Sequence, residues 1–176
     1  TWLEGELMED YLHDLLTVQR YAQLNREIMA EEIMKGMKLK AQEARSSVHN
    51  YFDASEGMRI LRKGAISARR GEQIVIPVNM RDGIILGTGK GNPEWNFSAP
   101  HGSGRKIRRD EVKERYTVAA FRKEMKGIYS SCIAADTLDE ALCIRSIEDI
   151  REKIRDTAEI EKILKPVYNF KAGDNM

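Results

Sequence analysis

The stretch GEQIVIPVNMRDGIILGTGKG, residues 71–91, decides the fold class of this 176-residue chain. Two apolar runs, Gln73–Val78 and Ile84–Leu86, flank the turn-forming triplet Arg81–Gly83, and a further run, Met58–Leu61, precedes them. Short runs rich in β-branched residues and bounded by turn residues indicate strands. We therefore expect several sheet strands in the middle of the chain.

Helical patterns lie on both sides of these strands. From Met8 to Ile33 the apolar residues recur at spacings of three, four or seven, which predicts a long amphipathic helix that ends near Gly36. Thr117 is placed to cap a shorter helix that Gly127 closes. The capping-box pattern of Ser146–Asp149 opens another helix.

The remaining segments are less regular. Ser46–Tyr51 fits a loop or short strand, Ile128–Ile133 fits a strand, and the glycine-rich Gly87–Gly104 fits a functional loop. Ile160–Phe170 fits either a short helix or a terminal strand, because a proline interrupts it. Since no regular βαβ alternation occurs, we predict an α+β fold: a mixed or antiparallel sheet core with the long N-terminal amphipathic helix and further helices packed on it.

Composition excludes some partners and compartments. The 29 basic and 28 acidic residues nearly cancel, so any site for a polyanion must come from local clustering. Cys132 and Cys143 fit neither a CxxC pair nor a zinc ribbon, so we expect reduced thiols and a cytoplasmic location. No apolar run approaches the roughly 18 residues of a membrane span, so we expect no membrane partner.

The three histidines occupy different contexts. His13 lies among the exposed positions of the long helix, which favours a surface role. His49 follows two serines and precedes Asn50, a context that fits either a metal ligand or an ordinary loop histidine. His101 lies in SAPHGSGR, residues 98–105, where glycines let backbone N–H groups approach an anion. This segment therefore fits a phosphate-binding turn.

Four cationic residues continue this segment. They suit the neutralisation of phosphates on a nucleotide or an RNA backbone. Chemistry alone also leaves open a solvated basic turn without a ligand. These residues are Arg105, Lys106, Arg108 and Arg109.

Other nucleotide-binding and nucleophilic schemes fit the sequence less well. The GTGKG segment at residues 87–91 is no P-loop, because Ile84 and Gly91 stand where that motif needs Gly and Ser or Thr. The Asp82-Gly83 pair lacks the lysine that ATP-type ligases place two residues earlier, and no Gly-x-Ser-x-Gly elbow occurs. Schemes with a lysine or serine nucleophile are therefore disfavoured.

Five segments in order resemble successive signatures of the RtcB-type RNA ligases, the tRNA-splicing family that uses RNA 3′-phosphates. The resemblance extends from about Tyr11 to Lys171 and covers the C-terminal part of the family's usual length. The five segments are Leu61–Arg69, Ile76–Met80, Pro100–Arg105, Asp136–Ala141 and Leu164–Lys171.

The resemblance implies a chemical role for each matching residue. It implies that His101 is the catalytic nucleophile that attacks the α-phosphate of GTP to form a GMP-histidine intermediate. It also implies that His49 is the last of the manganese ligands. From their charge, we expect the four cations after His101 to bind the RNA backbone. The residues that it implies as nucleotide contacts are His49, Asn50, Pro77, Val78, Asn79, Met80, His101, Gly102, Ser103, Gly104 and Lys171.

The reaction that the resemblance implies joins an RNA 3′-phosphate or 2′,3′-cyclic phosphate to a 5′-hydroxyl, as in tRNA splicing and RNA repair. Its cofactors would be GTP and Mn²⁺, and its RNA partners would be tRNA halves or broken RNA. A requirement for an activating protein partner is left open.

The sequence also departs from the family pattern. Glu140–Arg145 reads EALCIR without the family's tyrosine, and Ile84 replaces a family serine. We expect the N-terminal half, which in the family supplies the other manganese ligands, to be missing from this sequence. We therefore expect residues 1–176 to be the C-terminal part of a single catalytic domain, inactive alone. The alternatives are a catalytically incomplete fragment that still binds nucleotide or RNA phosphate, and a structural protein without ligands.

Overall fold

The protein is an α+β fold built on small sheets, as expected. The computed structural model describes residues 2–138 and 142–170. In this part of the chain the pairs β1–β2 and β3–β6 and the three-stranded β4–β5–β8 sheet are antiparallel, whereas β7 and β9 are parallel. The strands are β1 (Asn50–Asp53), β2 (Ile60–Lys63), β3 (Ala65–Ser67), β4 (Gln73–Asn79), β5 (Gly83–Gly89), β6 (Ser98–Pro100), β7 (Tyr129–Ser130), β8 (Ala158–Leu164) and β9 (Tyr168–Asn169).

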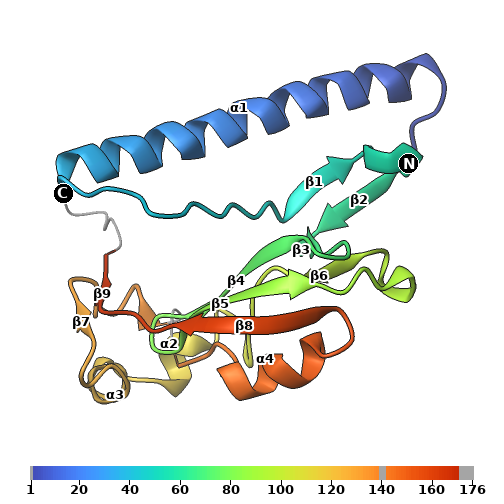
Figure 1. The fold of residues 1–176 in the computed structure, drawn as a ribbon. Helices are drawn as coiled ribbons and strands as arrows, with labels where there is room; N and C mark the ends of the chain where they lie inside the picture. Colours follow the sequence, from blue (N-terminus) through green and yellow to red (C-terminus); the bar gives the residue numbers. More distant parts are fainter. Residues whose placement is uncertain (1, 139–141, 171–176) are drawn as a thin grey trace.

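The β4–β5 hairpin is the centre of the fold (Figure 1). Ile74, Ile76 and Val78 alternate inward along β4 and are buried, which is the period that a strand with one buried face requires. Gly83 closes the turn at a φ of 93°, and a Cβ there would overlap the Leu164 carbonyl of β8. Glycine is therefore needed at this turn, both for its backbone conformation and for the close approach of the neighbouring strand.

Helix α4 (Ile147–Ile154) covers the inner face of these strands. The capping box of Ser146 and Asp149 is present, as the sequence predicts. The isoleucines at the helix positions that face the sheet are buried, so α4 and the sheet share one core. Its buried residues are Ile66, Ala68, Ile74, Ile76, Val78, Ile85, Ala99, Ile147, Ile150, Ile154 and Ala158.

A second core lies under the two shorter helices, α2 (Val112–Arg115) and α3 (Val118–Glu124). The Thr117 hydroxyl accepts a hydrogen bond from the Ala120 N–H at 3.2 Å, which confirms the predicted cap. The residues buried together here are Val112, Phe121, Met125, Leu138 and Cys143.

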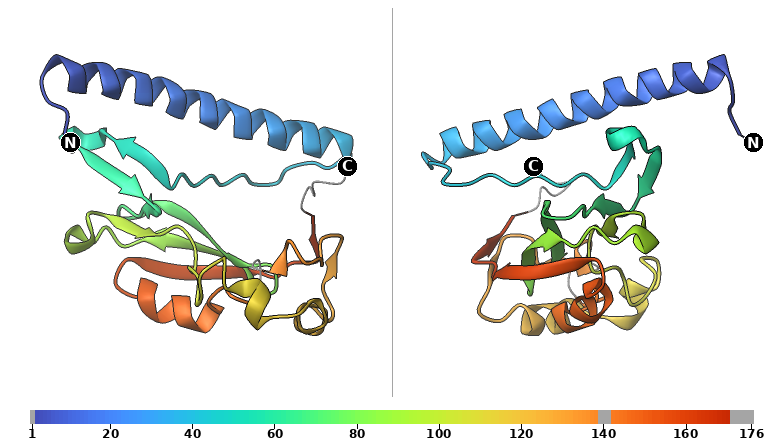
Figure 2. Two further views of the ribbon diagram at one scale, coloured as in Figure 1. Left: turned by 180° about the vertical axis from the view of Figure 1, so that it is seen from behind. Right: turned by 45° about the vertical axis from the view of Figure 1, so that its right-hand side comes forward.

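Helix α1 (Glu6–Gly36) confirms the predicted long helix, but no residue in it is buried. The extended segment 37–49 runs back beside α1, and both lie on the side of the strands opposite α2, α3 and α4 (Figures 1 and 2). Gln19 on α1 accepts a hydrogen bond from the Phe52 N–H and donates one to the Phe52 carbonyl. This pair of bonds fixes α1 against strand β1.

Three sequence expectations need correction. Gly87–Gly104 is not one loop, because β5 extends to Gly89 and the segment also holds the short 3₁₀ helix η2 (Pro93–Trp95) and strand β6. The strand expected over Ile128–Ile133 shortens to β7, and the helical option for Ile160–Phe170 is wrong. Pairing with the edge of β5 makes residues 158–164 a strand, which no local pattern shows. Within the described residues no helix is long and apolar enough to cross a membrane.

Candidate functional site

Strand pairing brings both candidate histidines to one glycine. In the β1–β2 pair, Asn50 lies opposite Lys63, so the preceding His49 approaches Gly64. In the β3–β6 pair, Ala65 lies opposite Pro100, so the following His101 approaches the same glycine from the other side. His49 and His101, which are far apart in the sequence, therefore meet because the two antiparallel strand pairs adjoin at Gly64.

His101 is exposed and held by one strong hydrogen bond. Its Nδ1 lies 2.6 Å from the Gly64 carbonyl oxygen. Because a carbonyl oxygen only accepts hydrogen bonds, Nδ1–H is the donor, and the neutral ring carries its lone pair on Nε2. The backbone of Gly64 therefore selects the tautomer in which Nε2 is a nucleophile or a ligand.

His49 stacks on His101. The ring centroids are 4.8 Å apart and the ring planes differ by 12°. Partial burial, the nearby His101 and the cationic Arg26 of α1 together lower the pKa of His49. Each of these causes disfavours the imidazolium form, so His49 keeps the neutral ring that a metal ligand requires.

Gly64 itself is held in place from β1. The Asn50 side-chain oxygen accepts a hydrogen bond from the Gly64 N–H at 2.9 Å, and the His49 carbonyl accepts one from the Ala65 N–H at 3.3 Å. Gly64 has a φ of 66°, a backbone conformation that side-chain-bearing residues adopt at a cost. Asn50 therefore holds Gly64 in place, and Gly64 in turn holds His101.

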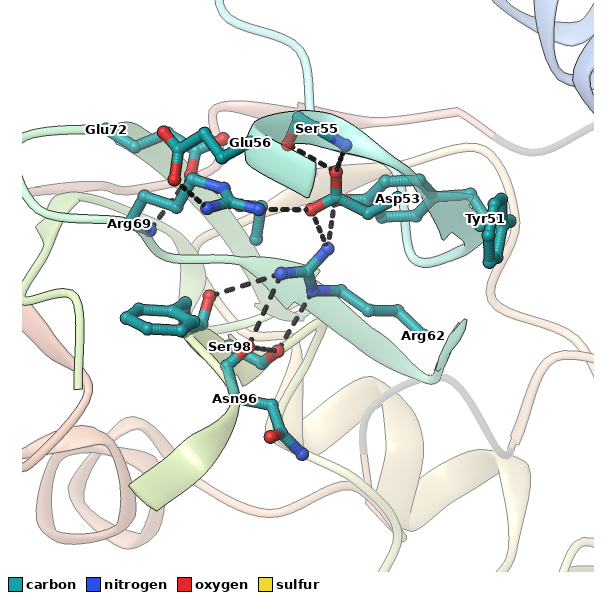
Figure 3. Close-up of polar contacts among 12 residues, drawn as sticks. Tyr51, Asp53, Ser55, Glu56, Arg62, Arg69, Glu72, Asn96 and Ser98 are labelled. Atoms are coloured by element: carbon teal, nitrogen blue, oxygen red, sulfur yellow. Dashed lines mark hydrogen bonds and ion pairs between the residues drawn. The ribbon is translucent and has the colours of Figure 1, made fainter. Parts of the chain in front are cut away.

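A buried ion pair ties together the strands that carry these residues (Figure 3). The guanidinium of Arg62 on β2 is 2% exposed and donates to the Asp53 carboxylate of β1 at 2.5 Å and to the Ser98 hydroxyl of β6 at 2.9 Å. Arg69 donates to the same carboxylate at 3.0 Å. One guanidinium thus joins the strands that lead to His49, Gly64 and His101.

Asp53, the carboxylate of this network, stays ionised at neutral pH. Burial raises the pKa of Asp53, but hydrogen bonds from Ser55, Arg62 and Arg69 outweigh burial and hold the pKa well below its ordinary value. Asp53 is therefore ionised and its charge is shared by two arginines, as a buried carboxylate requires. The sequence gives no sign of this network, because its members are spread over β1, β2, β6 and the connections between them.

The predicted phosphate turn, His101–Gly104, packs on the predicted guanosine turn, Pro77–Met80. The buried Ser103 hydroxyl donates to the Val78 carbonyl at 2.9 Å. A Cβ on Gly102 would lie 3.2 Å from the Pro77 carbonyl oxygen, so glycine permits the close approach. The two turns therefore lie together, and the Ser103 side chain packs between them. Gly102 is partly exposed and Gly104 is exposed.

Asn79 organises the second turn from within. Its side-chain oxygen accepts hydrogen bonds from the Arg81 and Asp82 N–H groups, and its amide donates to Asp82 and to the Arg145 carbonyl at 3.2 Å. The Asn79 side chain is thus fully occupied inside the protein. Beside this turn lies a groove of about 600 Å³. Its lining includes Pro77, Val78, Asn79, Met80, Ile84, Ile144 and Tyr168.

The cations after His101 line a separate groove of about 530 Å³. Lys106 lies 3.6 Å from Asp149 and Arg108 lies 3.0 Å from Asp110, so both have acidic neighbours. Arg109 is exposed outside the lining. The structure adds Arg115, which was not among the predicted cations because it lies beyond them in the sequence, at the end of α2. The lining residues are Arg105, Lys106, Ile107, Arg108, Glu111 and Arg115.

The described residues do not form a complete metal site. No group of three or more His, Cys, Asp or Glu side chains in residues 2–138 and 142–170 is arranged to hold a metal ion. At the strand junction, the His101 ring stacks on the His49 ring with nearly parallel planes. The predicted contact Lys171, and the Asp139–Ala141 part of one signature, lie outside the described residues.

An exposed histidine is held at a strand junction, and cations that follow it in the sequence line a groove. Both features suit chemistry on phosphate groups. The sequence matches the family described as tRNA-splicing ligase RtcB over residues 2–172. The chain therefore belongs to the RtcB tRNA-splicing ligase family.

Two relatives in Escherichia coli show the extent of the likeness. The chain is 32% identical over 133 residues to RNA-splicing ligase RtcB1 of strain ATCC 25922, and equally to RNA-splicing ligase RtcB of strain K12. Each match covers 66% of this chain and 33% of the relative. The chain thus spans about a third of the length of the curated relatives it matches.

Proposed function

We propose that this chain carries the nucleophile of a GTP-dependent RNA ligase that joins an RNA 3′-phosphate or 2′,3′-cyclic phosphate to a 5′-hydroxyl. The observation that carries the proposal is the 2.6 Å hydrogen bond from His101 Nδ1 to the Gly64 carbonyl. This bond leaves the Nε2 lone pair of an exposed ring as the reactive atom, and a neutral imidazole nitrogen is a competent nucleophile at phosphorus. Membership of the RtcB family supports the same reaction.

The proposed chemistry proceeds in three displacements. His101 Nε2 forms a bond to the α-phosphorus of GTP while the bond to the β-phosphate oxygen breaks and pyrophosphate leaves. An oxygen of the RNA 3′-phosphate then attacks that phosphorus, the N–P bond breaks, and GMP is transferred to the RNA end. Finally the RNA 5′-hydroxyl attacks the RNA 3′-phosphorus, loses its proton and displaces GMP. A cyclic phosphate must first be opened by water to the 3′-phosphate.

The nucleotide is proposed to lie where the two turns meet. We propose that backbone groups of Gly102 and Gly104 approach its phosphates. The groove beside Pro77–Met80, about 600 Å³ in volume, supports the placement of the guanosine. Ile84, which replaces a family serine, lines this groove together with Ile144, which belongs to the segment that lacks the family's tyrosine. We therefore propose that guanine is held here by apolar contact, with Lys171 as a further contact.

Manganese is proposed to bind at His49, whose lowered pKa keeps its ring neutral. When bound, the metal would neutralise charge on the triphosphate. The described residues offer no group of three or more ligands at this place and so do not fit a metal ion by themselves. No step above depends on the metal, and the other ligands are proposed to come from another part of the domain, of which residues 1–176 would be the C-terminal part.

RNA is proposed to follow the cationic groove. Arg105, Lys106 and Arg108 line it, Arg109 lies exposed beside it, and phosphate contacts of this kind give affinity without sequence preference. Cys132 and Cys143 are buried reduced thiols, which supports a cytoplasmic location.

The experiment is guanylylation measured by intact mass. With GTP and Mn²⁺, residues 1–176 alone should form little GMP adduct, because one imidazole does not hold manganese tightly enough to orient a triphosphate. Adding the N-terminal part of the E. coli relative in trans should restore the adduct and RNA joining. Failure to form any adduct in the completed mixture, with folding verified, would reject the proposal.

A second candidate function is a binding fragment without catalysis. The incomplete metal site of the described residues favours it. It predicts that GTP and RNA bind to the completed mixture while no covalent GMP appears, so the same assay separates the two.

A further inference from the structure

A third groove lies against the strand junction at Gly64 that holds His101. It is bounded by strand β2 on one side, by η2 and strand β6 on another, and by the end of α4 at its base. Its volume is about 420 Å³, within the roughly 300–1,000 Å³ typical of small-molecule sites. The lining residues are Ile60, Leu61, Arg62, Lys63, Gly64, Ala65, Trp95, Asn96, Ser98, Ala99, Pro100, Lys153 and Thr157.

The lining combines an aromatic face with positive charge. Trp95 is 56% exposed and Leu61 is 72% exposed, although both side chains are large and apolar. No carboxylate is among the residues that line the groove. The charge of Arg62 is used by Asp53, whereas Lys63 and Lys153 have no ion-pair partner within the described part of the chain. The groove therefore offers a stacking surface and unneutralised ammonium groups together.

The aromatic wall is rigidly presented. Asn92 caps η2 by accepting a hydrogen bond from the Glu94 N–H at 3.0 Å, and its amide donates to the Asp156 carbonyl at 3.2 Å. The second bond joins the loop that carries Trp95 to the turn that follows α4. Lys153 lies in the last turn of that helix. Arg62 fixes the opposite wall through its bond to Ser98. Both walls are therefore set before any ligand arrives, which lowers the cost of binding.

We propose that this groove binds one nucleotide of the single-stranded RNA, with its base stacked on Trp95 and its phosphate at Lys153. Aromatic side chains bind bases of any sequence through their π faces, and lysines match the backbone charge. Gly64, whose carbonyl holds His101, lines the groove, so an RNA strand leaving the ligation site passes directly into it. The choice of RNA as the occupant rests on the proposed function, while the groove and its charge do not.

The test uses the fluorescence of Trp95. The chain has two tryptophans, and Trp2 is 81% exposed at the other end of the sequence. Trp2→Phe therefore leaves Trp95 as the single reporter without touching the groove. Titration with a short single-stranded RNA that ends in a 3′-phosphate should quench this signal, because a stacked base lies against the indole.

Two variants separate stacking from charge. Trp95→Ala should weaken RNA binding, measured by anisotropy of labelled RNA, by roughly fivefold or more, which corresponds to a stacking contribution of at least about 1 kcal/mol. Lys153→Ala should reduce the slope of log K against log salt by about 0.7, the value expected for one phosphate contact on a single strand. Lys126→Ala, an exposed lysine on another face, is the matched control and should leave the binding constant nearly unchanged.

The outcomes distinguish this inference from the proposed function. RNA that binds without quenching Trp95, or with unchanged affinity for Trp95→Ala, overturns the inference and leaves ligation intact. Quenching by GTP alone at the same concentration also overturns it, because the groove would then be a mononucleotide pocket. Quenching by RNA, together with a completed mixture that never forms a GMP adduct, supports the groove and counts against the ligase.

Discussion

Arg62 offers the sharpest test of how the fold positions the candidate site. Its guanidinium is almost fully buried and bonds to Asp53, Ser98 and the Tyr51 hydroxyl. The change Arg62→Met keeps the length and the apolar stem of the side chain but removes the charge and the donors. It leaves the Asp53 carboxylate with one arginine, Arg69, in place of two.

The magnitude follows from burial. Removal of one partner from a buried ion pair typically costs 3–5 kcal/mol, because the remaining charge is left without compensation. Asp53 keeps Arg69 and Ser55 as partners, so we expect the lower end, about 3 kcal/mol. For a chain of this size that loss corresponds to a decrease in Tm of about 6–12 °C.

The assay is urea or thermal unfolding at neutral pH, followed by circular dichroism. Arg59→Met is the matched control, because Arg59 on the same segment makes only a surface ion pair, 3.5 Å from Glu9, with both side chains 61% exposed. Exposed pairs contribute about 0–1 kcal/mol. If Arg62→Met were no more destabilising than Arg59→Met, the buried network would not hold these strands together and the reasoning would be refuted.

Further predictions concern charge, RNA and capping. Because the pKa of Asp53 is lowered in the folded protein, the unfolded chain binds more protons than the folded chain below about pH 4, and stability falls on acidification. Asp53→Asn should flatten this pH dependence when unfolding is measured from pH 7 to pH 3. Changing Arg105 and Arg109 to Ala should weaken RNA binding and reduce its salt slope by about 0.7 per lost contact; an unchanged slope in a salt titration counts against the assignment. Ser146→Ala should cost about 1 kcal/mol in urea unfolding through loss of the α4 cap.

Local sequence signals predicted the elements that local interactions determine. The period of the apolar residues gave α1, the Ser146 capping box gave α4, and the turn at Gly83 gave the central hairpin. For Ile160–Phe170 the sequence left a helix and a strand both open, because residues 158–164 alternate poorly, and pairing with β5 makes β8 a strand. The end of the Gly87–Gly104 loop became β6 for the same reason, through its partner β3.

The candidate site was predictable in its residues but not in its geometry. His49 and His101 could be selected from their polar and glycine-rich contexts and from the family resemblance. Their stacking, and the hydrogen bond of His101 to Gly64, depend on two strand registers, which the sequence does not reveal. The roles of Arg62 and Trp95 were missed because an arginine in a strand and an exposed tryptophan have no local signature.

The central claim is that His101 Nε2 forms a covalent bond to GMP. The direct measurement is peptide mapping by mass spectrometry after incubation with GTP and Mn²⁺ in the mixture completed by the N-terminal part of the E. coli relative. We predict one GMP adduct on His101, labile to acid as an N–P bond is, absent from His101→Ala and undiminished in His13→Ala, whose histidine lies exposed on α1. An undiminished adduct in His101→Ala, or an adduct mapped to His49 or a lysine, would contradict the account.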